Sequence, residues 1–161
     1  MKIIRIADLC DEYTDQLQVA EPTGFINFGG NTFFKGEIVT IRCLDNNPLV
    51  RKVLSEDGEG KVLVVDGGAS KKCALAGDNI VKLALDHKWD GIIINGCIRD
   101  SVAISKLSIG VKALYTHPIK SGKLDNGVFN VPVTFAGITF TPGDYLYSDE
   151  DGIVVSKDKL H

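Results

Sequence analysis

The sequence predicts one α/β domain with a mixed sheet, a central βαβ unit and an added β region at the carboxyl-terminal side. One observation is a continuous apolar run at 61–66, followed by an apolar helical stripe at 78–87 and a second apolar run at 91–95. Such runs are typical of strands buried on both faces, and strand, helix and strand in succession are typical of a parallel pair. A second observation is the change beyond Gly127 to short strands separated by turns.

The amino-terminal part predicts a helix, a loop and a strand–helix pair. Apolar residues at helical spacing indicate a short amphipathic helix over Asp8–Leu17. The segment 24–35 is rich in glycine and aromatic residues, which indicates an irregular loop followed by a strand. The β-branched run 38–44 predicts another strand. Asn46-Asn47-Pro48 is typical of a cap and first turn, so we expect a helix that ends near Leu54.

The remaining segments complete a single domain over residues 1–161. The run 111–116 is a third buried strand of the predicted sheet. Turns at 142–144 and 149–152 accompany short predicted strands at 131–135, 138–140, 145–147 and 153–156. We find no internal repeat or linker that would divide the chain. A chain of 161 residues is long enough to bury one hydrophobic core.

Composition narrows the classes of function. The net charge is −3 and the basic residues are scattered, so we expect no direct binding of nucleic acid. No apolar run approaches the roughly 18 residues of a membrane span, and the amino end turns acidic before a secretory signal could form. The four cysteines are widely spaced, which favours reduced thiols in the cytoplasm. Cys97 has two interpretations, a reactive thiol or a small buried hydrophobic residue.

Polar and glycine-rich segments follow the buried strands, which is where parallel sheets bind their ligands. These segments are Asp66–Ser70, Gly77–Ile80 and Asn95–Asp100. The glycines after Asp66 lack the spacing of nucleotide-binding loops. Gly77 and Asp78 are typical of a turn with an aspartate cap. The start of a helix also presents free backbone N–H groups that suit a carboxylate, and the two interpretations are compatible.

Arg99 and Asp100 also have two interpretations. As a charged dipeptide they fit a surface ion pair with their neighbours. Directly after a buried strand, however, Arg99 offers a planar fork for a substrate carboxylate, and Asp100 offers a hard oxygen ligand for Mg²⁺ or Mn²⁺. One protein carboxylate is enough for Mg²⁺, because this ion keeps several waters and takes ligands from its substrate. The histidines stand alone in the sequence, and no Gly-x-Ser-x-Gly nucleophile motif is present.

The spacing of these residues resembles that of a known family. Asp78, the residues 79–98 and then Arg99-Asp100 reproduce the D-x20-R-D pattern of the class II aldolases in the RraA-like family. That family includes 4-hydroxy-4-methyl-2-oxoglutarate aldolases and proteins named regulator of ribonuclease activity A. The resemblance extends along nearly the whole chain, through Phe28-Gly29-Gly30, Val64–Gly68, Gly77–Asn79, Gly143-Asp144 and Asp149–Val155.

The resemblance implies a domain of the swivelling α/β/α type that assembles as a homotrimer and acts as a metal-dependent lyase. Asp100 would bind the divalent cation, Mg²⁺ or Mn²⁺, and Asp78 would orient a water that removes a proton. A small 2-keto acid substrate would be held by Arg99 and by the backbone N–H groups of Gly77, Asp78, Asn79 and Ile80. Cleavage of 4-hydroxy-4-methyl-2-oxoglutarate would release pyruvate through an enolate, with oxaloacetate decarboxylation as a secondary activity.

The same family implies a second, non-catalytic function. Some members bind and inhibit a ribonuclease of the RNase E type. Members named for this role typically lack the Arg-Asp step of the motif. This chain carries the complete motif in Arg99-Asp100, which favours the enzyme over the regulator.

Overall fold

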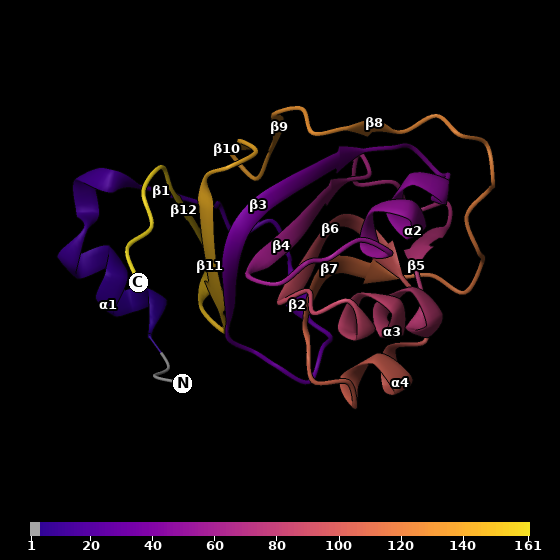
Figure 1. Cartoon of the computed structure of the whole chain (residues 1–161), viewed down its shortest axis with the longest axis horizontal. Helices are drawn as coiled ribbons and strands as arrows, with labels where there is room; N and C mark the ends of the chain where they lie inside the picture. The colour runs from indigo at the N-terminus through magenta and orange to yellow at the C-terminus, as the bar shows by residue number, and fades with distance from the viewer. Residues whose placement is uncertain (1–3) are drawn as a thin grey trace.

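A computed structural model describes residues 4–161 of the chain (Figure 1). Ten strands form one mixed sheet in the order β1-β12-β11-β3-β4-β6-β7-β2, with β5 beside β6 and β8 beside β3. The hairpin β9–β10 forms a separate sheet. The helices are α1 (Ile6–Glu12), the 3-10 helix η1 (Thr14–Gln16), α2 (Pro48–Leu54), α3 (Asp78–Asp86) and α4 (Ser101–Ser105). The strands are β1 (Leu17–Val19), β2 (Ile26–Asn27), β3 (Phe34–Arg42), β4 (Lys61–Asp66), β5 (Ala74–Ala76), β6 (Gly91–Ile98), β7 (Gly110–Thr116), β8 (Val128–Phe129), β9 (Val133–Phe135), β10 (Ile138–Phe140), β11 (Tyr145–Asp149) and β12 (Gly152–Ser156).

The centre of the sheet is parallel, as the apolar runs predict. Strands β3, β4, β6 and β7 pair in parallel, with α2 between β3 and β4 and with α3 between β4 and β6. Every residue of β6 is buried, as are residues 62–65 of β4. The predicted mixed α/β fold with a central βαβ unit is therefore confirmed. Because these strands run in one direction, their carboxyl ends meet at one edge of the sheet.

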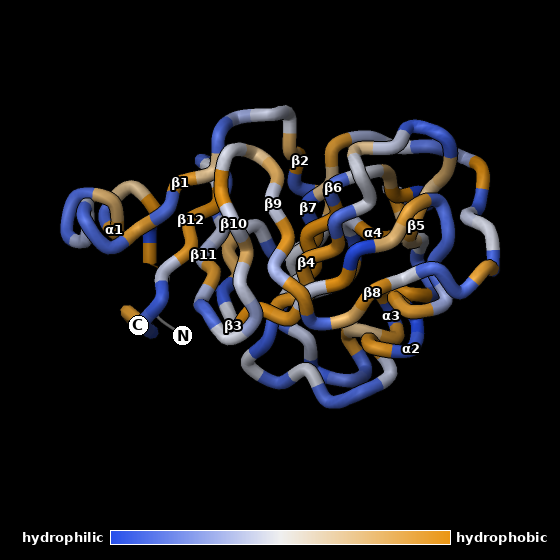
Figure 2. The backbone as a smooth tube through the Cα atoms, turned by 90° about the horizontal axis from the view of Figure 1, so that it is seen from above, coloured by the Kyte–Doolittle hydropathy of each residue, from blue (hydrophilic) through white to orange (hydrophobic). Residues whose placement is uncertain are grey.

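Different elements pack against the two faces of the parallel strands. Helices α2, α3 and α4 cover one face (Figure 1), where their apolar side chains pack against the strands in one cluster. The opposite face packs against the β9–β10 hairpin and the carboxyl-terminal strands in a second cluster. Figure 2 shows apolar residues gathered on the central strands and polar residues on the outer loops. Within residues 4–161 no helix is long and apolar enough to cross a membrane.

The added β region at the carboxyl-terminal side is an antiparallel hairpin, β11–β12, whose strands pair with β3 and β1. A buried cation supports the turn of this hairpin. Lys112 of β7 donates from Nζ to the carbonyl oxygens of Asp149 at 2.6 Å and Gly152 at 3.0 Å. Burial lowers the pKa of Lys112 to about 8. One titratable side chain of β7 therefore holds the turn of the β11–β12 hairpin.

Three of the parallel strands, β3, β6 and β7, begin next to one aromatic ring. Phe34, the first residue of β3, packs its ring against Gly91 of β6 and Gly110 of β7. A Cβ atom added at either glycine would overlap that ring. These two strand glycines are therefore required by the close approach of the ring, since interiors are packed to crystal-like density.

Several predicted bounds are wrong because pairing in the sheet overrides local pattern. The amino-terminal helix covers Ile6–Glu12 rather than Asp8–Leu17, since Leu17 pairs with Ser156 as the first residue of β1. The strand predicted at 38–44 covers Phe34–Arg42, because its first residues pair with β11 and its ladder with β4 ends at Arg42.

Other differences involve short elements. The second buried strand reaches Ile98 rather than Asn95, since β5 and β7 continue the ladder. The segment 24–35 contains the short strand β2 before β3 begins. Strands β5 and β8 and helix α4 were not predicted, because segments of two to five residues are too short to show a period.

Candidate active site

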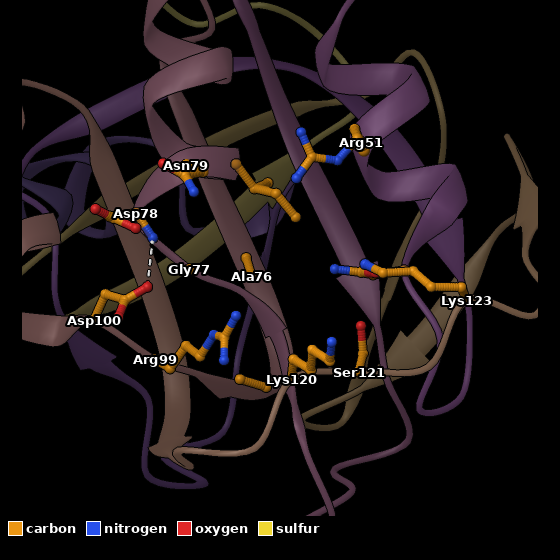
Figure 3. A pocket seen from close by; sticks show the side chains of 13 residues that line it. Arg51, Ala76, Gly77, Asp78, Asn79, Arg99, Asp100, Lys120, Ser121 and Lys123 are labelled. Atoms are coloured by element: carbon orange, nitrogen blue, oxygen red, sulfur yellow. Dashed lines mark hydrogen bonds between the residues drawn. The ribbon is translucent and has the colours of Figure 1, made fainter.

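The predicted site residues converge on one pocket at the carboxyl-terminal edge of the parallel strands (Figure 3). Gly77, Asp78, Asn79 and Ile80 line it at the junction of β5 and α3. Arg99 and Asp100 line it where β6 ends. Residues 78, 99 and 100, which the sequence motif singles out, therefore lie together in space.

Gly77 allows the two segments to approach each other. Its backbone is extended, with φ −125° and ψ −166°, which any residue can adopt. An added Cβ atom, however, would lie 2.5 Å from Oδ2 of Asp100 and 3.3 Å from Cγ of Arg99. A side chain at this position would therefore displace the Asp100 carboxylate. The interpretation of Asp78 as the helix cap is corrected, because Gly77 occupies the cap position and Asp78 is the first helical residue.

Asp100 supplies the cap that Gly77 lacks. Its Oδ2 accepts a hydrogen bond from the backbone N–H of Asp78 at 3.1 Å, drawn as a dashed line in Figure 3. The Asp100 backbone is left-handed, with φ 59° and ψ 40°. That region costs a residue with a side chain about 1–2 kcal/mol, and Asp and Asn are among the few that adopt it routinely. Backbone strain of this kind concentrates at functional sites.

Arg99 directs its guanidinium group into the pocket (Figure 3). Its backbone N–H donates to the carbonyl oxygen of Ala76 at 3.0 Å, which joins the end of β6 to β5. Its Nη1 donates to the carbonyl oxygen of Pro118 at 3.4 Å. Among residues 4–161, no carboxylate forms an ion pair with Arg99. The planar fork is therefore available to an anion.

Asp78 carries its carboxylate at the same mouth of the pocket. Lys82, one turn further along α3, donates from Nζ to Oδ2 of Asp78 at 3.3 Å. This hydrogen bond is the main reason that the pKa of Asp78 lies below its usual value. The carboxylate is consequently ionised at neutral pH and can accept a hydrogen bond from a water molecule.

The first turn of α3 presents backbone donors to the pocket. The N–H of Asp78 is used by Asp100, and the N–H of Val81 donates to the carbonyl oxygen of Gly77 at 3.1 Å. No oxygen in the described part of the chain accepts a well-formed hydrogen bond from the N–H of Asn79 or Ile80, although the Asn79 N–H faces the Asp78 carboxylate and helps to lower its pKa. Free N–H groups at a helix start favour anions. Of the predicted backbone donors, Asn79 and Ile80 therefore remain for a carboxylate, whereas Asp78 does not.

Five polar residues that the sequence patterns did not indicate complete the pocket: Asn47, Arg51, Lys120, Ser121 and Lys123. Asn47 directly precedes α2, and Arg51 lies within that helix. The other three come from the segment 117–127 after β7, which crosses the edge of the sheet before returning as β8 (Figure 1). No period or motif links this segment to the D-x20-R-D pattern, so only the path of the chain shows its role.

Backbone and side-chain bonds hold this segment against the sheet. The N–H of Ala74 donates to the carbonyl oxygen of Ile119 at 2.8 Å, and Gly122 pairs with Asn46. Asn47 was predicted within a helix cap, but its side chain makes no capping bond. Instead its Nδ2 donates to the carbonyl oxygen of Leu75 at 2.9 Å, and its Oδ1 accepts from Nζ of Lys123 at 3.0 Å.

Comparison with known proteins identifies the family. The RraA-like family profile, described as Aldolase/RraA, matches residues 6–155. A relative from Laribacter hongkongensis, provisionally named 4-hydroxy-4-methyl-2-oxoglutarate aldolase, is 54% identical over 154 residues and 96% of each chain. This chain belongs to the RraA-like family.

Solved structures of similar proteins support the RraA-like fold. A Geobacillus kaustophilus protein, titled as an S-adenosylmethionine: 2-dimethylmenaquinone methyltransferase, superposes with a TM-score of 0.95 at 43% identity, covering 98% of this chain and 97% of the other. The RNA-processing inhibitor RraA from Thermus thermophilis superposes with a TM-score of 0.94 at 38% identity, covering 99% and 96%. The names of the relatives support a lyase at the level of the family.

The metal-binding groups of this RraA-like pocket suit a divalent cation that keeps its bound waters. They do not suit a metal that is enclosed by protein ligands. Within residues 4–161, no group of three or more His, Cys, Asp or Glu side chains is placed to hold a metal ion. Asp100 engages α3 through Oδ2, whereas its Oδ1 receives no hydrogen bond from the described residues. A single free carboxylate oxygen beside open solvent suits Mg²⁺ or Mn²⁺, which keep waters and take ligands from the substrate.

The surroundings of Cys97 favour its interpretation as a small buried residue rather than a reactive thiol. It is 1% exposed, and its thiol lies 3.4 Å from the carbonyl oxygen of Ser70. Burial raises the pKa of the Cys97 thiol, which disfavours the nucleophilic thiolate. All four cysteines of the chain are free thiols.

Proposed function

We propose that this RraA-like protein is a divalent-metal-dependent carbon–carbon lyase that cleaves 4-hydroxy-4-methyl-2-oxoglutarate into two molecules of pyruvate. One observation carries the proposal: an unpaired Arg99, the strained Asp100 and the ionised Asp78 meet at the open start of α3. That arrangement joins a carboxylate fork, a hard metal ligand and a proton acceptor in one pocket.

Binding of the 2-keto end uses donors that remain available at the pocket. Arg99 binds the substrate carboxylate through its guanidinium fork, and the N–H groups of Asn79 and Ile80 add two backbone donors. Their positions are fixed by β6 and α3, so little ordering is needed when the substrate binds. Bidentate recognition of this kind sets the orientation of the keto group.

The chemistry proposed is a retro-aldol cleavage. Asp78, through an intervening water, accepts the proton of the C4 hydroxyl, the C3–C4 bond breaks, and its electron pair forms the enolate of pyruvate. The other fragment leaves as a second pyruvate, and C3 of the enolate takes a proton. Arg99 stabilises the negative charge of the enolate. Oxaloacetate loses CO₂ to give the same enolate, so its decarboxylation is the expected secondary activity.

Asp100 is the residue that would hold the divalent cation. When bound, such a cation polarises the 2-keto oxygen and stabilises developing negative charge, a contribution commonly worth several kcal/mol. The left-handed backbone of Asp100 sets its carboxylate between α3 and the pocket, which serves both the helix and the metal.

The test is pyruvate release from 4-hydroxy-4-methyl-2-oxoglutarate and from oxaloacetate, coupled to lactate dehydrogenase. We expect activity with Mg²⁺, loss with EDTA, and recovery when Mg²⁺ or Mn²⁺ is restored. Arg99→Gln is expected to lower kcat/KM by about 100-fold or more, as for a removed charge-stabilising donor. Arg42→Gln, at an exposed arginine that ends β3 outside this pocket, is the matched control. Absent activity, or activity that EDTA leaves unchanged, would refute the proposal.

A second candidate function is inhibition of a ribonuclease, which the name and 38% identity of the Thermus structure favour. This function needs a protein surface and no cleavage chemistry. Pull-down with an RNase E type enzyme, together with its rate of RNA cleavage, tests it. If the protein at micromolar concentration neither binds the ribonuclease nor slows its RNA cleavage, this function is ruled out.

We also propose that the protein assembles as a homotrimer. Exposed apolar side chains on the segment 117–127, on β8 and on the turn after β3 support an interface there: Leu44, Ile119, Leu124, Val128 and Phe129. Sedimentation equilibrium should give three times the 17.4 kDa chain mass. Phe129→Asp should dissociate the assembly, and a monomer or dimer in the wild type would contradict the proposal.

A further inference from the structure

The side chain of Arg99 has room in two directions. Arg99 lines the pocket at the start of α3, and with Asp100 it also lines a second cavity of about 210 Å³, beside Thr116, His117 and Pro118. A long arginine side chain has many rotamers, so its guanidinium group needs a partner that holds it in one of the two cavities. Figure 3 shows the guanidinium group directed into the first.

The partner that holds this group belongs to the chain after β7. Nη1 of Arg99 donates to the carbonyl oxygen of Pro118 at 3.4 Å, which is the one hydrogen bond of the guanidinium group among residues 4–161. Pro118 is exposed and lies beyond the end of β7, so no strand ladder fixes its carbonyl group. The direction of the Arg99 side chain therefore depends on what holds the turn around Pro118.

The ring of His117 closes this turn, which comprises residues 117–119. The backbone N–H of His117 donates to the carbonyl oxygen of Ile98 at 2.9 Å and so continues the pairing of β6 with β7. Proline has no N–H, so Ile119 supplies the next backbone donor. That N–H donates to Nδ1 of the His117 ring at 3.1 Å. The ring thus bonds to the backbone two residues on, as an asparagine does in an Asx turn.

The carbonyl groups of this turn bind the two strands that carry the pocket. The carbonyl oxygen of Pro118 accepts from Arg99 at the end of β6. The carbonyl oxygen of Ile119 accepts from the N–H of Ala74 at 2.8 Å, at the start of β5. One ring nitrogen therefore fixes a turn that contacts both strands. Because Nδ1 is an acceptor here, the neutral ring carries its proton on Nε2.

We propose that His117 is a positioning residue for Arg99: its Nδ1 fixes the turn 117–119, and the Pro118 carbonyl of that turn directs the guanidinium group to the substrate. The inference rests on the proposed function for the role of Arg99. His117 acts through Arg99 and contacts neither the substrate nor the metal in this assignment. The role requires a hydrogen-bond acceptor at the position of Nδ1, whereas a packing role would require only the volume of the ring.

Two substitutions separate these requirements. His117→Leu keeps a similar volume and removes the acceptor. His117→Asn has less volume, but its side-chain oxygen can accept from the N–H two residues on. We expect His117→Leu to lower kcat/KM for pyruvate release about tenfold or more, and His117→Asn to stay within about threefold of the wild type. His87→Leu, at another half-buried histidine that ends α3 outside both cavities, is the matched control and should leave kcat/KM unchanged.

Binding of pyruvate tests the route through Arg99 without turnover. NMR titration in the presence of Mg²⁺ measures the affinity of the wild type, His117→Leu, Arg99→Gln and the double variant. We expect His117→Leu to weaken pyruvate binding about fivefold or more, as for one lost hydrogen bond. In the Arg99→Gln background the same substitution should change the affinity less than about twofold, because the group through which it acts is absent. Thermal unfolding verifies that each variant keeps its fold.

An equal loss in His117→Leu and His117→Asn would overturn the proposal, because the acceptor would then have no special role. An unchanged effect of His117→Leu in the Arg99→Gln background would also overturn it. Coupling between the two residues in a protein that releases no pyruvate from 4-hydroxy-4-methyl-2-oxoglutarate supports the role of His117 and refutes the cleavage. Cleavage without the coupling does the reverse, and a wild type that does not bind pyruvate would refute both.

Discussion

Substitution of Asp100 separates its role in folding from its role in chemistry. Asp100→Asn keeps a side chain that tolerates the left-handed backbone and an oxygen that can accept the hydrogen bond of the Asp78 N–H. It removes the charge that favours the helix start, a loss of about 0.3–1 kcal/mol. Asp100→Ala loses the hydrogen bond, about 1 kcal/mol, and forces alanine into the strained region, about 1–2 kcal/mol more.

Stability and activity should therefore respond differently. Urea unfolding should rank Asp100→Asn as more stable than Asp100→Ala by about 1–3 kcal/mol. Asp100→Gly should fall between them, because glycine relieves the backbone strain but loses the cap. All three variants should nevertheless lose metal-dependent pyruvate release by about 100-fold or more. Activity in Asp100→Asn close to that of the wild type, or equal stability of the Asn and Ala variants, would refute the reasoning.

Three further predictions follow from close contacts. Gly77→Ala should displace the Arg99-Asp100 step and lower kcat/KM about tenfold or more with a stability loss of only about 1 kcal/mol; unchanged kinetics would contradict this. Gly110→Ala should press on the Phe34 ring and cost about 1–3 kcal/mol in urea unfolding without a direct effect on the pocket; full stability would contradict this. Lys112 has a pKa lowered to about 8 by burial, below the unfolded value, so above pH 8 the unfolded chain holds more of the protons of this side chain; the free energy of unfolding of the wild type relative to Lys112→Met should therefore rise between pH 8 and 9, by up to about 1 kcal/mol. An identical pH profile in the two proteins would refute the assignment.

The comparison with a variant matters for the Lys112 prediction. Burial raises the pKa of Cys43 to about 12 and, with the same leading cause, that of Cys73 to about 11. Unfolded thiols titrate near their ordinary pKa of 9.0, so already between pH 8 and 9 the unfolded chain releases thiol protons that the folded chain keeps, which lowers stability as pH rises. The two effects have opposite sign, and the difference between the wild-type and Lys112→Met profiles isolates Lys112.

The sequence predicted the parts of the fold that depend on local pattern. The apolar runs at 61–66 and 91–95 correspond to β4 and the first part of β6, because a strand buried on both faces carries apolar residues without interruption. The helix predicted at 78–87 matches α3 closely. The amino-terminal helix was misplaced because Leu17 has helical spacing in the sequence but pairs with β12 in the sheet.

The site was predictable only as far as its motif extends. Asp78, Arg99 and Asp100 follow buried strands or begin a helix, so their meeting at one edge could be expected. Lys123 reaches the pocket through the crossing of the segment after β7, and Arg51 reaches it from α2; local sequence does not encode this meeting. The cap residue Gly77 has no side chain, so Asp100 accepts the hydrogen bond from the start of α3 in its place. This arrangement likewise depends on contact between two strands, and the sequence alone favoured Asp78 as the cap.

The central claim concerns the meeting of a metal, a 2-keto acid and the Arg99-Asp100 step. A crystal structure with Mn²⁺ and pyruvate, in which anomalous scattering locates the ion, tests it most directly. We predict that the ion contacts a carboxylate oxygen of Asp100 and that the pyruvate carboxylate binds Arg99 and the start of α3. An ion bound elsewhere, or pyruvate outside this pocket, would contradict the account.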